Sequence, residues 1–314
     1  MPRIIPPDLV EPVVRVVLGS IDTGDGGTEH QRNVLRALVT GYWDRPDLDL
    51  DAVAPATPAE AAELIVDPAH RRRTRQFMVM LELCRLPMTA AQVERTQVYA
   101  EALGESGPGL DMMRVLVEEG KEAASAYLMS RSLAVAVADS SDATLRDVPV
   151  MIEEPDPDLV ARLRSFGDLP EGTLGREYHD WMVDHGFDFP GETVGSPAVI
   201  LGHDLCHVVT GYGPYGMEEI AVNAMQLGVS DTDHHWINLV MSLALREAAI
   251  FLPENYEPIA PGTLDREGSA EMFADALRRG AECTGDFVGA DLLGMANQPI
   301  EDVRARFGIQ PRRV

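Results

Sequence analysis

The sequence has few cysteines and no long apolar run. Its three cysteines, Cys84, Cys206 and Cys283, are widely spaced and odd in number, so they form no disulfide framework and favour a reducing compartment. The longest apolar runs, 133–138 and 237–245, are far shorter than the roughly 18 residues that a membrane helix needs. The N-terminus, MPRIIPPDLVEP, lacks the apolar core of a signal peptide. We therefore expect a soluble, cytoplasmic chain, peripheral to the inner membrane at most.

Basic residues are also scarce. The chain has 26 Lys and Arg against 51 Asp and Glu, a formal net charge of −25. A face that binds nucleic acid needs a local excess of positive charge, so this composition disfavours nucleic acid as a partner. The local exceptions include Arg71, Arg72, Arg73 and Arg75, which we interpret as a solvated helix face.

Most of the chain shows apolar residues at the 3.6-residue period of a helix and lacks hairpin signals, which predicts an all-α fold. The segment 138–157 is acidic, carries prolines and has no helical period. We take it as a linker between an N-terminal helical domain, 1–137, and a second helical domain, 158–314.

Several helix boundaries follow from local signals. Thr89 and Gln92 have the spacing of a capping box. Asp22 and Asp25 lie in a glycine-rich loop that we interpret as a helix entry rather than a cation site, because it lacks the regular carboxylates of an EF-hand. Other helices are expected at 29–43, 58–66, 68–86, 110–134, 159–166, 173–185, 197–211, 217–228, 231–252, 264–283 and 300–307.

The stretch GHDLCHVVTGYGPYGMEEI, residues 202–220, carries a candidate metal site. His203 and His207 are four residues apart and share one helix face, and Asp204 falls within the same arc of about 100°. A glycine- and proline-rich break then places Glu219 in the first turn of the next helix, where the helix dipole favours an ionised carboxylate. Two imidazoles with carboxylates suit Zn²⁺, and also Fe²⁺ or Mn²⁺.

Alternatives to this interpretation remain open. His203 and His207 could be a hydrogen-bonded pair in the core, and Cys206 could add a thiolate or simply be a small buried side chain. HDLCH differs from the zinc-protease pattern HExxH, because Asp204 is one methylene shorter than glutamate, although a metal hydrolase stays possible.

The HDxxH motif followed after eleven residues by Glu resembles the zinc signature of the coenzyme Q biosynthesis protein 4 family. LPEGTLGREY, 169–178, is similar to a segment upstream of that family's site, and VRARFGIQP resembles its C-terminal helix and tail. The resemblance covers roughly 158–311 and departs at Glu218, where the family usually has glycine. The segment IDTGDGGTEHQRNVLRAL in the first half resembles helical domains of the tellurite-resistance B type.

The resemblance implies an all-α, metal-binding protein of ubiquinone-like quinone biosynthesis. Its metal ligands would be His203, Asp204, His207 and Glu219, and it would bind a prenylated aromatic precursor or another isoprenoid lipid. It also implies a role in decarboxylation and hydroxylation at ring carbon C1, with Asp204 and Glu219 as candidate catalytic residues. Other quinone-biosynthesis enzymes are possible partners, and the sequence leaves a homo-oligomer open.

Arg176 and Tyr178 lie in the family-like GREY segment and are candidate substrate-binding residues. Arg176 could receive a carboxylate or phosphate in a bidentate contact, or could form a structural ion pair or bind a helix end. The alternative function is a non-catalytic isoprenoid-lipid-binding or scaffold protein in which the metal only joins two helices.

Overall fold

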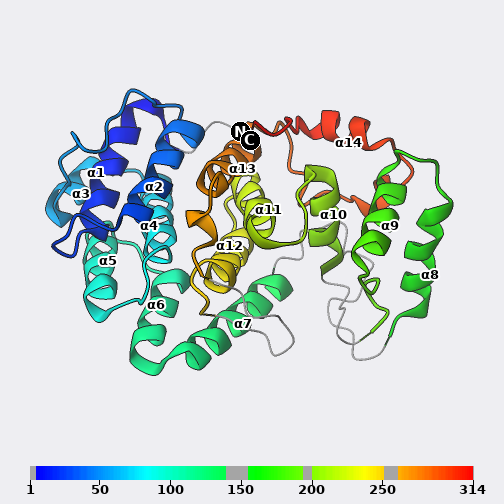
Figure 1. Ribbon diagram of the computed structural model, residues 1–314, viewed down its shortest axis with the longest axis horizontal. Helices are drawn as coiled ribbons and strands as arrows, with labels where there is room; N and C mark the ends of the chain where they lie inside the picture. Colours follow the sequence, from blue (N-terminus) through cyan, green and yellow to red (C-terminus); the bar gives the residue numbers. More distant parts are fainter. Residues whose placement is uncertain (1–4, 139–154, 194–199, 251–260, 314) are drawn as a thin grey trace.

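The computed structural model describes residues 5–138, 155–193, 200–250 and 261–313 (Figure 1). These residues contain α-helices, short 3₁₀ and π turns and no β-strand, which confirms the all-α prediction. None of the described helices is long and apolar enough to cross a membrane. The α-helices are α1 Val10–Ile21, α2 Glu29–Ala37, α3 Pro58–Leu64, α4 Pro68–Glu82, α5 Ala90–Ala102, α6 Pro108–Glu119, α7 Lys121–Ala138, α8 Pro157–Ser165, α9 Leu174–His185, α10 Leu201–Thr210, α11 Gly216–Val229, α12 Asp233–Arg246, α13 Ser269–Glu282 and α14 Ile300–Phe307.

Helices α11, α12 and α13 lie in the middle of the molecule, with α1 to α5 at one end and α8 to α10 at the other (Figure 1). Helix α13 packs against α11 on one side and against α2 and its π-helical extension, Leu38–Tyr42, on another. Buried apolar side chains from both halves of the sequence form one continuous core. Most of the expected linker, 138–157, falls outside the described residues, so the proposed domain boundaries stay a prediction.

Helices α11 and α13 approach each other at backbone contact. A Cβ atom added to Gly280 would lie 2.2 Å from the carbonyl oxygen of Met225, and one added to Gly228 would lie 2.5 Å from that of Leu277. Both distances are far below van der Waals contact, so only glycine fits at this crossing. The glycines therefore fix how closely α11 lies against the rest of the core.

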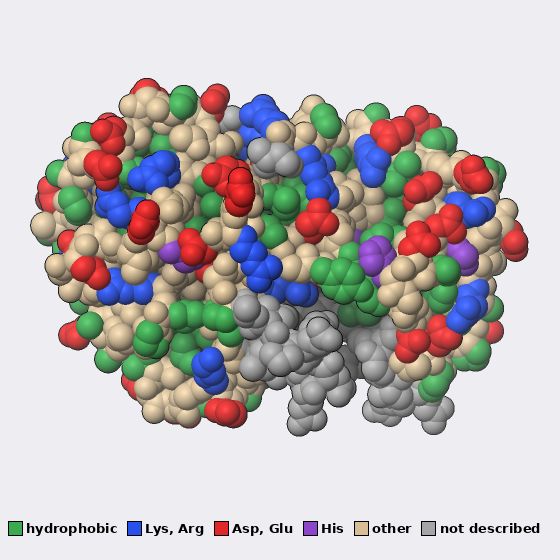
Figure 2. Space-filling view, viewed as in Figure 1, with side chains coloured by type: hydrophobic (Ala, Val, Ile, Leu, Met, Phe, Trp, Pro, Cys, Tyr) green, Lys and Arg blue, Asp and Glu red, His purple; other side chains and the backbone are tan. Residues whose placement is uncertain are grey.

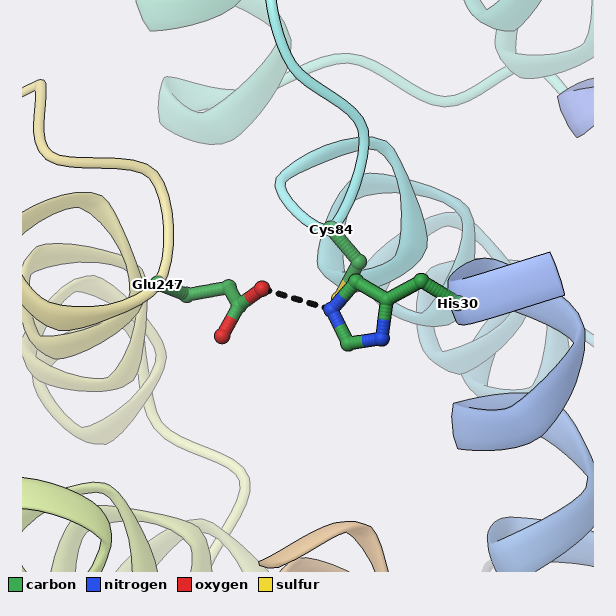
Figure 3. Close-up of side chains that lie close together, drawn as sticks. All are labelled: His30, Cys84 and Glu247. Carbon is green, nitrogen blue, oxygen red and sulfur yellow. Dashed lines mark hydrogen bonds and ion pairs between the residues drawn. The ribbon is translucent and has the colours of Figure 1, made fainter. Parts of the chain in front are cut away.

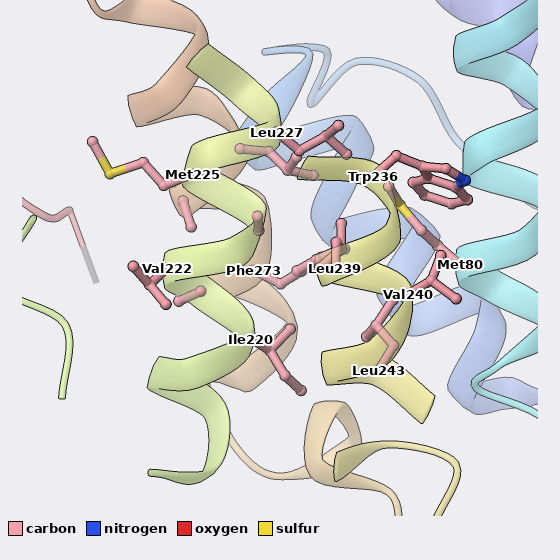
Figure 4. Close-up of a cluster of buried hydrophobic side chains, with 14 of the residues drawn as sticks. Met80, Ile220, Val222, Met225, Leu227, Trp236, Leu239, Val240, Leu243 and Phe273 are labelled. Atoms are coloured by element: carbon pink, nitrogen blue, oxygen red, sulfur yellow. The ribbon is translucent and has the colours of Figure 1, made fainter. Parts of the chain in front are cut away.

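The apolar runs of α4 and α12 fill the centre of the fold. Met80 of α4 lies beside Trp236, Val240 and Leu243 of α12, all of them buried (Figure 4). Phe273 of α13 belongs to the same cluster. These side chains pack against one another, which gives α12 a fixed position between the two ends of the molecule.

The arginines of α4 show that the interpretation as a solvated face is wrong for two of the four. Arg73 and Arg75 are buried, with 0% and 2% of their surface exposed. Arg73 Nη2 lies 3.5 Å from Asp231, which sits between α11 and α12, and Arg75 Nε lies 3.3 Å from Glu105. Carboxylates from distant segments thus offset the cost of burying these two guanidinium groups. The charges that neighbour them in the sequence do not indicate these partners.

On the face shown in Figure 2, basic side chains are scattered among acidic and apolar ones. The three cysteines are buried and form no disulfide bond, as expected.

The starts and ends of several helices can be compared with the sequence-based predictions. The capping box of Thr89 and Gln92 is present at the start of α5. Asp22 accepts hydrogen bonds from two backbone N–H groups of its own glycine loop, as a helix-entry loop requires. The single helix expected at 110–134 is wrong, because Gly120 adopts a φ of +96° and separates α6 from α7. Helix α1 was not predicted, because its valine-rich sequence has low helix propensity and burial against α4 and α5 stabilises it instead.

Candidate metal centre

Two helices and the turn between them build the candidate metal centre. His203 and His207 project from α10, which ends at Gly211 in the left-handed region with a φ of +76°. The chain turns there, and α11 begins at Gly216 with Glu219 in its first turn. The two helices and the break between them are therefore as the sequence predicts, although residues 197–199 of the expected first helix lie outside the described residues.

The ligand atoms of His203, His207 and Glu219 converge on one point. The two Nε2 atoms of the histidines lie 3.0 Å apart. Glu219 Oε1 lies 3.1 Å from His203 Nε2, and Glu219 Oε2 lies 3.2 Å from His207 Nε2. Three potential ligands from two helices thus form a small triangle, which is the arrangement that the spacing predicted for these residues.

The size of this triangle fits a divalent ion. At a metal–ligand distance of about 2.1 Å, two ligand atoms lie roughly 3.0 Å apart at a right angle and about 3.4 Å apart at a tetrahedral angle. The observed distances between the ligand atoms, 3.0 to 3.2 Å, lie at the lower end of this range. Two histidines and one carboxylate on one face of an ion also leave coordination positions free for other ligands.

The surroundings of His207 fix its orientation. Its Nδ1–H donates to the carbonyl oxygen of Tyr212 at 3.1 Å, which leaves the Nε2 lone pair directed toward His203 and Glu219. The ring also stacks on Trp181 of α9, with centroids 5.4 Å apart and an interplanar angle of 20°. A backbone carbonyl on the second nitrogen is the usual way in which proteins orient a metal-binding histidine.

The electrostatics of the group favour an ionised carboxylate. Burial opposes ionisation of Glu219, but the neighbouring His203, and then His207, hold the pKa of Glu219 well below its usual value. Burial likewise opposes protonation of His203, but Glu219 raises the pKa of that imidazole, whereas burial lowers the pKa of His207. The ionised carboxylate suits a cation, whereas the raised pKa of His203 means that a metal ion must displace a proton from that imidazole in order to bind it.

Asp204 and Cys206 do not join the triangle. Asp204 shares α10 with the histidines, but its carboxylate is not among the atoms that converge there. Burial, with a further contribution from the charge of Glu219, raises the pKa of Asp204 to about 7. Cys206 is fully buried and does not belong to the group either. The structure thus brings together three of the four predicted ligands and leaves Asp204 beside them.

The two candidate substrate-binding residues face different directions. Arg176 and Tyr178 are two residues apart on α9, which puts them about 200° apart around the helix. Arg176 pairs with Asp180 at 2.7 Å and donates to the carbonyl oxygen of Gly167. Tyr178 is buried, and burial, with the charge of Asp204, raises its pKa well above the usual value. Arg176 is thus engaged in structural contacts, while Tyr178 lies on the side of Asp204.

Arg246 is a charged neighbour of the centre that the sequence motifs do not identify. It ends α12, and its Nη2 lies 3.9 Å from Glu219 Oε2. Twenty-seven residues and one whole helix separate the two, so no local spacing predicts the contact. Trp181 was missed for a similar reason, because a lone tryptophan on an amphipathic helix reads as ordinary core.

The departure at Glu218 has a structural explanation. Its Oε2 accepts a hydrogen bond from the N–H of Gly213 at 2.7 Å, and its Oε1 pairs with Arg312 at 2.5 Å. Arg312 in turn lies over the ring of Tyr212, 4.3 Å from its centroid. Glu218 therefore braces the turn between α10 and α11 and ties it to the C-terminal segment.

No protein-family model matches this chain, and a search of curated proteins finds no match.

Proposed function

We propose that this chain is a metal-dependent protein of quinone biosynthesis that binds a prenylated aromatic precursor and acts at its C1 carbon. The observation that carries the metal part is the triangle of His203, His207 and Glu219, whose edges match those of a coordinated divalent ion. Zn²⁺ is the first candidate, and Fe²⁺ and Mn²⁺ suit the same donor set. The substrate class rests on the resemblance of HDxxH, the later Glu and the GREY segment to the coenzyme Q biosynthesis protein 4 family.

Solvent reaches one side of the group. The side chains of His203 and Glu219 are 29% and 17% exposed, whereas that of His207 is 2% exposed. A ligand can therefore approach past His203, whereas the ring of His207 is stacked on Trp181 of α9. This asymmetry favours a site that receives a substrate over one that only joins two helices.

Arg246 is the residue that we assign to the acidic group of the substrate. It is 8% exposed and lies next to Glu219, so a carboxylate that approaches the centre meets a cation there. Arg176, which the sequence suggested for this role, instead forms an ion pair with Asp180. A guanidinium binds a carboxylate in a planar, two-point contact, which would orient the aromatic ring against the centre.

The chemistry follows from these positions. A divalent ion, when bound, supplies a Lewis acid that stabilises negative charge on the oxygens of a bound ring. Arg246 would hold the carboxylate that is lost as CO₂, and Asp204 is the candidate residue to hold or deliver a proton beside it. Hydroxylation at the same carbon additionally consumes O₂ or another oxidant.

The test uses a prenylated hydroxybenzoate as the substrate. We expect metal-loaded protein to release CO₂ from it, and the His203→Ala, His207→Ala double variant to lose the metal of this centre together with turnover. His70→Ala, which changes a histidine of α4, is the control and is expected to retain both. Asp204→Asn is expected to keep the metal and lose turnover. If loaded protein releases no CO₂ and the metal-free form binds the compound equally well, the catalytic proposal is wrong.

The alternative is a lipid-binding or scaffold protein with a structural metal. It predicts that isoprenoid lipid extracted from purified protein remains at the same level in the His203→Ala, His207→Ala variant. The proposal predicts that the bound precursor falls together with the metal, because its acidic group lies at the centre.

A further inference from the structure

A second group of possible metal ligands lies where the two halves of the sequence meet. His30 comes from α2, Cys84 follows the end of α4, and Glu247 follows the end of α12 (Figure 3). One ligand atom of each residue lies within 4.8 Å of those of the other two. These residues are 54 and 163 positions apart along the chain, so only the fold brings them together.

This group is well shielded from solvent. The Glu247 side chain is 2% exposed, Cys84 is 5% exposed and the His30 side chain is 16% exposed. His30 Nε2 lies 2.7 Å from Glu247 Oε1, and the other Glu247 oxygen accepts a hydrogen bond from the N–H of Leu264 at 2.6 Å. The carboxylate is thus held in place from the side away from His30.

A second carboxylate lies near the imidazole. Asp265 Oδ1 lies 3.3 Å from His30 Nδ1, on the side of the ring opposite Glu247. His30 Nδ1 makes no hydrogen bond to any described residue. A small rotation of the Asp265 side chain would be needed to form the carboxylate–histidine–metal arrangement that is common around zinc.

The three donors are those that zinc prefers. Sulfur, imidazole nitrogen and carboxylate oxygen all bind Zn²⁺, at about 2.3, 2.1 and 2.1 Å. Ligand atoms at a tetrahedral angle on such an ion lie about 3.4 Å or more apart. The His30–Glu247 pair at 2.7 Å would therefore open by roughly 0.7 Å, which side-chain rotation can supply.

We propose that His30, Cys84 and Glu247 form a second divalent-metal site, with donors suited to Zn²⁺, that joins α2, the end of α4 and the end of α12. It shares no residue with the centre at His203, His207 and Glu219, so it goes beyond the proposed function and can be tested without it. Its effect would be structural, because the ion would connect the first half of the sequence to the second at a buried point.

Substitution with Co²⁺ tests this site directly, because a thiolate bound to Co²⁺ gives an intense charge-transfer band in the near ultraviolet. We expect wild-type protein to show the band with Co²⁺ and to hold one Zn²⁺ at this site. Cys84→Ala is expected to lose the band and to bind one equivalent of zinc less than wild type. Cys206→Ala and Cys283→Ala, which change buried cysteines outside the group, are expected to keep both.

The site is also expected to survive loss of the other centre. The His203→Ala, His207→Ala variant should retain the band while losing the other equivalent of metal. Glu247→Gln gives a second variant if Cys84→Ala does not fold, and it should weaken Co²⁺ binding at the thiolate at least tenfold. Wild-type protein that binds Co²⁺ with no thiolate band, or a band that disappears in Cys206→Ala and not in Cys84→Ala, would overturn the proposal.

Discussion

The ion pair between Arg73 and Asp231 gives a sharp prediction about how the two halves of the sequence are held together. Arg73 of α4 is fully buried, and Asp231 belongs to the connection between α11 and α12. Arg73 Nε and Nη1 have no hydrogen-bond partner among the described residues, so the guanidinium depends on its contacts with Asp231 and with the carbonyl oxygen of Leu227. Asp231→Asn removes the negative charge while keeping the size of the side chain.

The expected loss is large. Removing one partner of a buried ion pair costs about 3–5 kcal/mol, because the remaining charge stays buried without compensation. An unfolding entropy of about 2.1 cal/mol/K per residue over 314 residues amounts to roughly 0.66 kcal/mol/K. The melting temperature of Asp231→Asn should therefore fall by about 5–8 °C.

Asp233→Asn is the matched control. Asp233 also pairs with an arginine of α4, Arg72, at 3.0 Å, but its side chain is 71% exposed. Exposed pairs contribute about 0–1 kcal/mol, so this variant should melt within about 1.5 °C of wild type. Both are measured by calorimetry at matched pH and salt. Equal melting temperatures for the two variants would refute the argument that a buried ion pair joins the halves.

Three further predictions concern packing, pH and metal binding. Gly280→Ala should lower the free energy of unfolding by about 1–3 kcal/mol, because the added methyl group forces α11 and α13 apart. At Gly289 an added methyl group meets only ordinary contacts, so Gly289→Ala should leave the free energy of unfolding unchanged. Equal chemical-denaturation curves for the two variants would contradict this difference. Hydrogen bonds from backbone N–H groups lower the pKa of Asp22, so its stabilisation is present above pH 3.8 and lost as the pH falls through the lowered pKa. Asp22→Asn should therefore make the free energy of unfolding fall less steeply as the pH is lowered. An unchanged dependence on pH would show that the hydrogen bonds to Asp22 do not stabilise the fold. Glu219→Gln should weaken metal binding more than about 100-fold in a chelator competition, since loss of an outer partner alone costs about 10–100-fold. Asp233→Asn, which changes an exposed carboxylate outside the group, should bind normally. Similar affinities for the two variants would exclude Glu219 as a ligand.

Features encoded in short segments were predictable from the sequence. The Thr89 capping box, the helix at 300–307 and the glycine break after α10 depend on residues within one or two turns of each other. The convergence of His203, His207 and Glu219 follows the same logic, because a four-residue spacing and one tight turn nearly determine it. Local signals therefore predicted the all-α fold and most of the candidate centre.

Features that depend on contacts between distant segments were not predictable. Arg73 is buried because Asp231, 158 residues later in the sequence, lies beside it. Arg246 reaches Glu219 only because α12 packs against α11. The group of His30, Cys84 and Glu247 has no sequence signature, since its members lie at three separate helix ends or faces. Asp204 is a case in which a local signal was not sufficient. It shares an arc of α10 with the two histidines, but its carboxylate lies outside the triangle.

An anomalous difference map from crystals grown with Zn²⁺ tests the central claim most directly. Data collected on both sides of the zinc absorption edge locate the ion without reference to activity. We expect a peak about 2.0–2.2 Å from the two Nε2 atoms of His203 and His207 and from a carboxylate oxygen of Glu219. No peak at that position, with the three side chains still hydrogen-bonded to one another, would contradict it.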